Sequence, residues 1–69
     1  MTVEALLEEM RRERISALVD ACVYHSMARN LMLRGDTEVA MSHWDTYREN
    51  SKKVDMLDIL IAEIEKRVS

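Results

Sequence analysis

The residues of this chain that could support chemistry are few, and the most suggestive pair is Cys22 and His25. A spacing of three residues places two side chains on one face of a helix, where a thiolate and an imidazole could bind zinc. His43 or Asp45 would have to supply further ligands. A structural zinc site usually needs four ligands, and the helix pairing derived below places His43 opposite Ala28 rather than Cys22. We therefore predict no metal and no cofactor.

Catalysis would require a pocket in which a nucleophile or an acid-base pair meets other polar groups. The chain has no glycine-rich phosphate loop and no serine or cysteine triad pattern. Arg14 and Asn50 fall at positions expected to be buried, where a single polar residue commonly fixes the alignment of two helices. Because two helices cannot enclose a pocket by themselves, we predict a protein that is not an enzyme.

The elements that position these residues follow from one glycine. The chain has 69 residues, no proline and a single glycine, Gly35, almost at its middle. The segments on either side are rich in helix-forming residues and contain no other helix breaker. We predict an all-α, antiparallel two-helix hairpin with helices at about 3–33 and 37–67, joined at Gly35, forming one domain over 1–69. Each helix should be roughly 45 Å long.

Residues of the expected types stand at the predicted helix ends. Thr2 can cap the first helix, and Glu4 in its first turn suits the helix dipole. Gly35 can adopt the left-handed conformation that ends a helix at little cost. Asp36 or Thr37 can then cap the second helix.

Both predicted helices carry apolar residues at alternating spacings of three and four, which is typical of a coiled-coil seam. In the second helix these positions are Ala40, His43, Tyr47, Asn50, Val54, Leu57, Ile61, Ile64 and Val68. In the first they are Val3, Leu7, Met10, Arg14, Ala17, Ala21, Tyr24 or His25, Ala28 and Met32. With the turn near Gly35, the numbers of facing residues should add up to about 71, which places Leu7 opposite Ile64.

Charge and hydropathy indicate the cellular compartment of the chain and the kinds of partner that it lacks. Ten basic and thirteen acidic residues give a formal charge of -3, which provides no general attraction to nucleic acid or to an anionic membrane. The longest apolar runs, 21–24 and 59–62, are too short for a signal peptide or a membrane span. The single cysteine cannot form an internal disulfide. We expect a cytoplasmic protein with no membrane and no nucleic-acid partner.

Several apolar residues fall outside the seam and predict a protein-binding surface. Isolated surface hydrophobic residues are common, but a contiguous stripe that includes the only tryptophan of a very small chain favours a binding role. Such a chain also buries too little surface to be very stable alone. The predicted binding residues are Ile15, Val19, Cys22, Val23, Met27, Leu33, Met41, Trp44 and Ile59.

The turn region resembles a known family. The segment 31–37 reads Leu-Met-Leu-Arg-Gly-Asp-Thr, Trp44 follows Arg34 by ten residues, and the closing helix is rich in Val, Leu and Ile. This pattern resembles the small YscE-like component of type III secretion systems, whose members are helical hairpins of this length. The resemblance covers nearly the whole chain, although Met41 stands where an aromatic residue is expected.

The resemblance implies a co-chaperone that functions in protein transport and virulence. Members of the family pair with a helical-repeat, TPR-like chaperone and help to keep the needle subunit soluble and unpolymerised in the cytoplasm before export. The chain alone could form a homodimer.

An alternative is a homodimeric four-helix bundle that acts as a small nucleic-acid-binding or protein-sequestering regulator. A basic patch for nucleic acid would consist of Arg11, Arg12, Arg14, Lys52 and Lys53. The overall acidity and the lack of a stacking aromatic residue among them argue against nucleic-acid binding.

Overall fold

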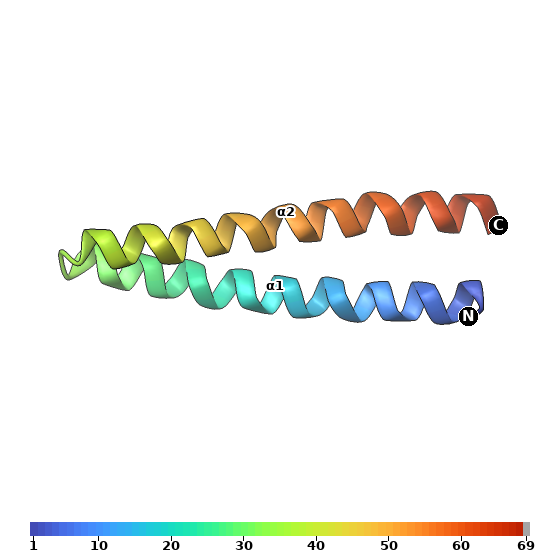
Figure 1. Ribbon diagram of the computed structural model, residues 1–69, viewed down its shortest axis with the longest axis horizontal. Helices are drawn as coiled ribbons and strands as arrows, with labels where there is room; N and C mark the ends of the chain where they lie inside the picture. The colour runs from blue at the N-terminus through green and yellow to red at the C-terminus, as the bar shows by residue number, and fades with distance from the viewer. Residues whose placement is uncertain (69) are drawn as a thin grey trace.

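The computed structural model describes residues 1–68, which form two antiparallel α-helices joined by a short turn (Figure 1). Helix α1 spans Val3–Leu33 and helix α2 spans Thr37–Val68. The hairpin is long and thin, with extents of 50 × 15 × 14 Å. This confirms the predicted all-α hairpin, with α2 one residue longer than expected.

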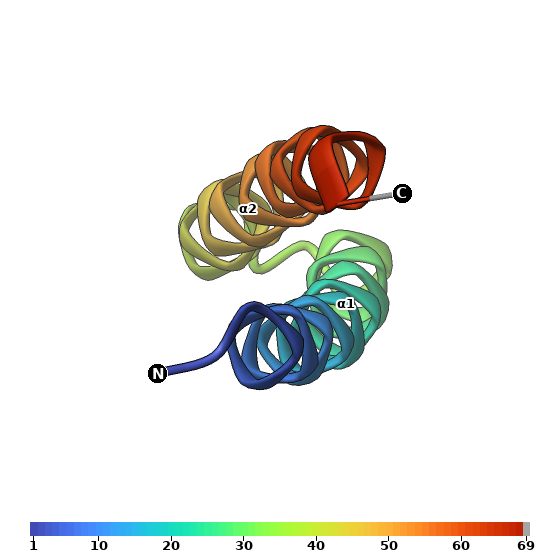
Figure 2. The ribbon, with the colours of Figure 1, turned by 90° about the vertical axis from the view of Figure 1, so that its right-hand side faces the viewer.

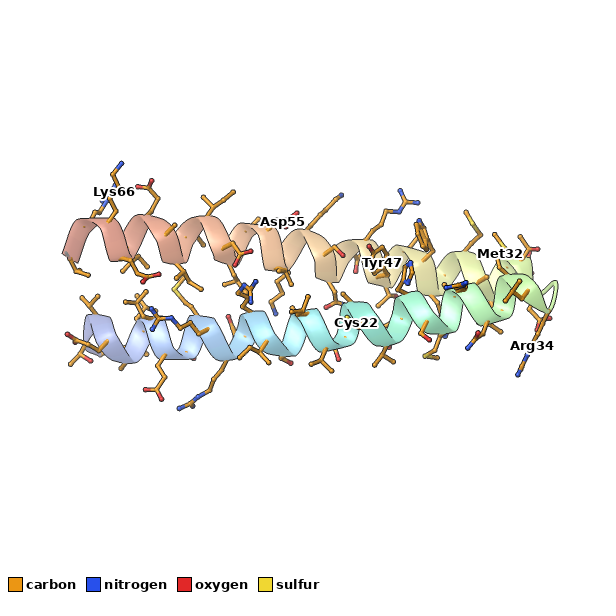
Figure 3. All side chains as sticks on the ribbon, turned by 180° about the vertical axis from the view of Figure 1, so that it is seen from behind. Cys22, Met32, Arg34, Tyr47, Asp55 and Lys66 are labelled. Carbon is orange, nitrogen blue, oxygen red and sulfur yellow. The ribbon has the colours of Figure 1, made fainter. Side chains whose placement is uncertain are left out.

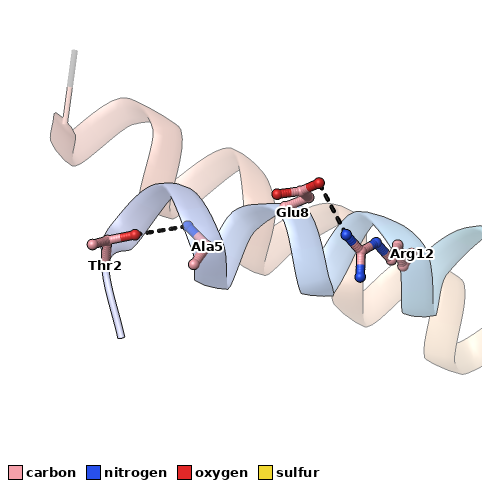
Figure 4. A network of polar contacts seen from close by, with 4 residues as sticks. All are labelled: Thr2, Ala5, Glu8 and Arg12. Atoms are coloured by element: carbon pink, nitrogen blue, oxygen red, sulfur yellow. Dashed lines mark hydrogen bonds and ion pairs between the residues drawn. The ribbon is translucent and has the colours of Figure 1, made fainter.

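Helix α1 begins with the predicted cap. The Thr2 side chain accepts a hydrogen bond from the Ala5 N–H at 3.1 Å, which satisfies one of the unpaired donors of the first turn (Figure 4). One turn further, Arg12 pairs with Glu8 at 3.0 Å on the same helix. Local interactions therefore support the first turns of α1.

The turn depends on Gly35, whose φ of 84° lies in the left-handed region. The Gly35 N–H donates to the Met32 carbonyl at 3.1 Å, and the Asp36 N–H donates to the Leu31 carbonyl at 2.9 Å. These two bonds are the Schellman arrangement that ends a helix. Helix α2 begins at Thr37, so Asp36 occupies the N-cap position.

The core is a single seam between the two helices. Its buried side chains are Leu7, Met10, Ala17, Ala21 and Ala28 of α1 and Ala40, Val54, Leu57 and Ile61 of α2. At the open end, Leu7 and Met10 form one cluster with Leu57 and Ile61, and Ile64 packs against it. Leu7 and Ile64, which were expected to face each other, thus lie in the same cluster, as the predicted register requires.

Three residues that we predicted in the seam are exposed. Val3 and Val68 are 43% and 57% exposed because they lie at the open ends of the helices, where no further turn covers them. Met32 is 52% exposed, and Leu31 is half-buried instead. The two helices twist gently around each other (Figure 2). Such a twist preserves a strict seven-residue repeat, and Leu31 continues that repeat whereas Met32 lies one position beyond it.

The seam is thin for a folded domain. Four of the nine buried residues are alanines, and no large side chain among the described residues is fully buried. The accessible surface is 5354 Å², whereas a compact monomer of 8.1 kDa would expose about 4500 Å². Over residues 1–68, neither helix has the long, weakly charged apolar stretch that crossing a membrane requires.

Candidate functional site

The most apolar of the concave features is a groove beside the turn, with a volume of about 370 Å³. We call it the turn groove. It is lined by His25, Ala28, Arg29, Met32, Leu33, Ala40, Met41 and Trp44. The structure therefore brings together three of the predicted binding residues, Leu33, Met41 and Trp44, from the end of α1 and the start of α2.

The shape of the turn groove follows from the sizes of its side chains. Ala28 and Ala40 are almost completely buried and end at Cβ, so they form a floor. Met32, Met41 and Trp44 are 52%, 48% and 37% exposed and rise around that floor. Figure 3 shows Met32 next to the turn. The result is a hollow whose walls are flexible or aromatic and almost wholly apolar.

Trp44 is held in place by other rings. Its ring centroid lies 5.0 Å from that of Tyr47 and 5.5 Å from that of His25, and His25 and Tyr47 are themselves 5.0 Å apart. Tyr24 instead turns into the seam, where it is half-buried and meets His43 at 5.5 Å. Of the two seam candidates, Tyr24 is therefore the seam residue, and His25 joins the wall of the turn groove. Packing of this kind restricts the conformations of an aromatic side chain.

The remaining predicted binding residues do not line the turn groove. Four lie on the side of α1 that α2 does not cover, and we call them the outer stripe: Ile15, Val19, Cys22 and Val23. Ile15 and Cys22, at the edge of this stripe, also line shallow hollows between the two helices. Met27, 41% exposed, lies one turn beyond Val23 at the edge of this stripe, and Ile59, 65% exposed, lies on α2. The predicted binding residues thus do not form one continuous surface.

Sequence reasoning missed three residues that line the groove: His25, Arg29 and Met32. Met32 was assigned to the seam, and a strict seven-residue repeat would have placed it outside. Arg29 is charged, so a search for apolar residues outside the seam does not identify it. Exposed Leu18 and Leu60 were also not singled out.

Each arginine of the basic patch considered for nucleic acid pairs with a carboxylate. The pairs are Arg11 with Glu65 at 3.2 Å, Arg12 with Glu8 at 3.0 Å, and Arg14 with Asp58. These carboxylates offset the positive potential that phosphate binding requires. The Arg14 pair also links the two helices, as expected of a residue that fixes their alignment.

The polar seam residues of α2 are satisfied within their own helix. Asn50 donates to the Thr46 carbonyl at 3.0 Å, and His43 Nδ1 lies 3.1 Å from the Val39 carbonyl oxygen. Asn50 therefore makes no cross-helix hydrogen bond, unlike Arg14. Within residues 1–68, no group of three or more His, Cys, Asp or Glu side chains is arranged to hold a metal ion.

No protein-family model matches this chain, and no curated protein or solved structure is significantly similar to it. The resemblance to the YscE-like family therefore stays a prediction based on the turn segment and Trp44. The geometry itself defines a helical hairpin with an open apolar groove at its turn.

Proposed function

We propose that this chain is a non-enzymatic co-chaperone or adaptor. It docks on a helical-repeat chaperone and helps to keep the needle subunit of a type III secretion system soluble in the cytoplasm before export. The turn groove is the observation that carries this proposal, because it is an apolar, partly preformed hollow that the hairpin does not fill itself. The turn sequence, which suggests the family, lies next to it.

The composition of the turn groove suits a helical partner. Hydrophobic grooves lined by methionine commonly accept the apolar face of an amphipathic helix, because methionine adapts to irregular surfaces. Tryptophan is one of the residues that contribute most to binding energy at interfaces. Trp44 is partly exposed and held by two neighbouring rings, so little conformational entropy is lost when a partner covers it.

The thin seam supports the same proposal. Exposed large apolar residues lie along both helices, while alanines occupy much of the core. A partner that covers part of this surface would stabilise the hairpin, because binding to the folded state alone shifts the folding equilibrium. The benefit would be mutual, since the chaperone would bury an apolar face of its own.

Co-expression tests the proposal. The chain is produced together with the helical-repeat chaperone and needle subunit of its own secretion system, and soluble complex is measured by co-purification. We expect Met41→Asp to abolish the complex, because it places a charge in the turn groove. The matched control is Met56→Asp, since Met56 is 63% exposed on the same helix and outside the groove. Undiminished co-purification of the Met41→Asp variant would show that the groove is not the docking site.

A second pair of variants separates the turn groove from the outer stripe of α1. Val19 is 54% exposed and lies outside the groove, so Val19→Asp tests the stripe alone. Loss of the complex with Val19→Asp but not with Met41→Asp would move the docking site to the outer face of α1. Circular dichroism of each variant checks that the hairpin remains helical.

A further inference from the structure

Three hollows follow one another along one side of the hairpin. The first, near the open end, is lined by Arg11, Arg14, Ile15, Asp58 and Ile61. The middle one is lined by Leu18, Ala21, Cys22, His25, Tyr47 and Ser51. The third is the turn groove, which shares His25 with the middle hollow. Each hollow draws on both helices, so this side forms one shallow trough.

Helix α1 carries a second coiled-coil repeat along this trough. Its members follow alternating spacings of three and four: Ile15, Leu18, Cys22, His25, Arg29 and Met32. Such spacing places them on one face. Ile15, Leu18 and Met32 are 58%, 41% and 52% exposed, so this second repeat is not covered by α2. A repeat of this kind normally indicates another helix packed alongside.

The uncovered area matches what a dimer buries. The hairpin exposes 5354 Å², which is several hundred Å² more than the roughly 4500 Å² expected of a compact monomer of 8.1 kDa. A specific interface buries about 800 Å² on each partner. Covering the trough with one copy of the hairpin would therefore bring each chain close to the exposure of an ordinary domain.

The distribution of apolar groups along the trough selects the relative direction of the two copies. The turn half is apolar, with Met32, Met41 and Trp44, whereas the open half is lined by Arg11, Arg14 and Asp58. Apolar surface meets apolar surface only if the two turns lie at the same end. A two-fold axis that runs along the hairpin produces this arrangement, and it stacks α1 of one copy on α2 of the other.

The charges of the open half favour the same arrangement independently. Here α1 contributes Arg11 and Arg14, and α2 contributes Asp58 and Glu65. Stacking α1 on the second copy's α2 places these arginines near carboxylates. The other two-fold packing stacks α1 on α1 with the turns at opposite ends, and it would place the same charged residues against the apolar turn half. Polarity and charge thus agree on one symmetric packing.

We propose that the trough is the self-association surface of this chain, and that two copies form a parallel, two-fold symmetric four-helix bundle with both turns at one end. Trp44 of each copy packs near Met32 of the other, so the turn groove is closed by the turn groove of the second chain. The homodimer does not depend on the adaptor role, although a chaperone that docks on the same groove would displace the second copy.

Sedimentation equilibrium of the purified chain tests the association. We expect a species of twice the chain mass to appear as the protein concentration is raised to about 1 mM. A dimer with a binding free energy of only about 4 kcal/mol has a Kd near that concentration and would already be detected. Met32→Asp should weaken dimerisation by about a hundredfold or more, because it buries two carboxylates in the interface. Met56→Asp, on the opposite side of α2, should leave it unchanged. A chain that stays monomeric at about 1 mM, or a dimer unaffected by Met32→Asp, overturns the proposal.

A spin-label distance tests the arrangement. In a Cys22→Ser background, a cysteine introduced by Asp36→Cys carries one label at each turn. Because packed helices are 8–10 Å apart, we expect the two labels within about 25 Å of each other. Opposite-ended packing would separate them by a distance approaching the 50 Å length of the hairpin and would refute the proposed symmetry. Neither result bears on co-purification with the chaperone, so this inference and the adaptor function can fail separately.

Discussion

Two isoleucines on one helix offer the most direct test of the seam. Ile61 is 8% exposed and belongs to the cluster of Leu7, Met10 and Leu57, whereas Ile59 is 65% exposed. Truncating a buried isoleucine to alanine costs about 2–5 kcal/mol through lost burial and the cavity left behind. A chain of this size has a free energy of unfolding of only about 3–10 kcal/mol. Ile61→Ala should therefore remove a large part of the total stability.

The matched variant, Ile59→Ala, should change the free energy of unfolding by no more than about 0.5 kcal/mol, because its side chain is already in water. Urea unfolding followed by circular dichroism measures both variants, at one low protein concentration so that self-association contributes equally. Equal losses for the two substitutions, or a larger loss for Ile59→Ala, would show that the seam does not lie where the structure places it.

Three further substitutions test local features by the same unfolding measurement. Gly35→Ala should destabilise the hairpin by about 1–2 kcal/mol, because alanine disfavours the left-handed backbone conformation of this position. An added Cβ meets no atom within 4 Å, so no steric clash adds to this cost. An unchanged stability would mean that the turn relaxes freely. Thr2→Ala should cost about 1 kcal/mol by removing the cap on the Ala5 N–H, and an unchanged midpoint would show that the first turn is frayed. Asn50→Leu should stabilise the hairpin by roughly 1 kcal/mol, because an apolar group replaces a half-buried amide that bonds only within its own helix. A loss of stability would mean that Asn50 contributes more to the seam than its geometry shows.

The helices and their register could be predicted because each depends on local chemistry. The position of Gly35, the cap at Thr2 and a seven-residue repeat are properties of neighbouring residues, and the structure confirms all three. The error at Met32 arose where the repeat was continued by one extra residue near the turn. There a single position decides between burial and exposure, and the supercoil selects Leu31.

The candidate site was harder to predict because it depends on two helices at once. Leu33, Met41 and Trp44 were identified as apolar residues outside the seam, but their grouping with His25 and Arg29 follows from the crossing of α1 and α2 near the turn. Apolar character alone does not separate the turn groove from the outer stripe of α1. The side on which a residue lies can be assigned only after the register is known.

The placement of the alanines connects the thin core to the exposed surface. Ala17, Ala21, Ala28 and Ala40 let the two helices approach closely, but each buries little apolar area. The larger side chains that would stabilise a monomeric hairpin, such as Met32, Met41 and Trp44, instead surround the floor that these alanines leave open. Replacing Ala28 with a larger residue would fill the turn groove from below. A hairpin of this composition therefore has little stability of its own and keeps an open hollow at its turn, and both the proposed docking and the proposed dimer depend on that hollow.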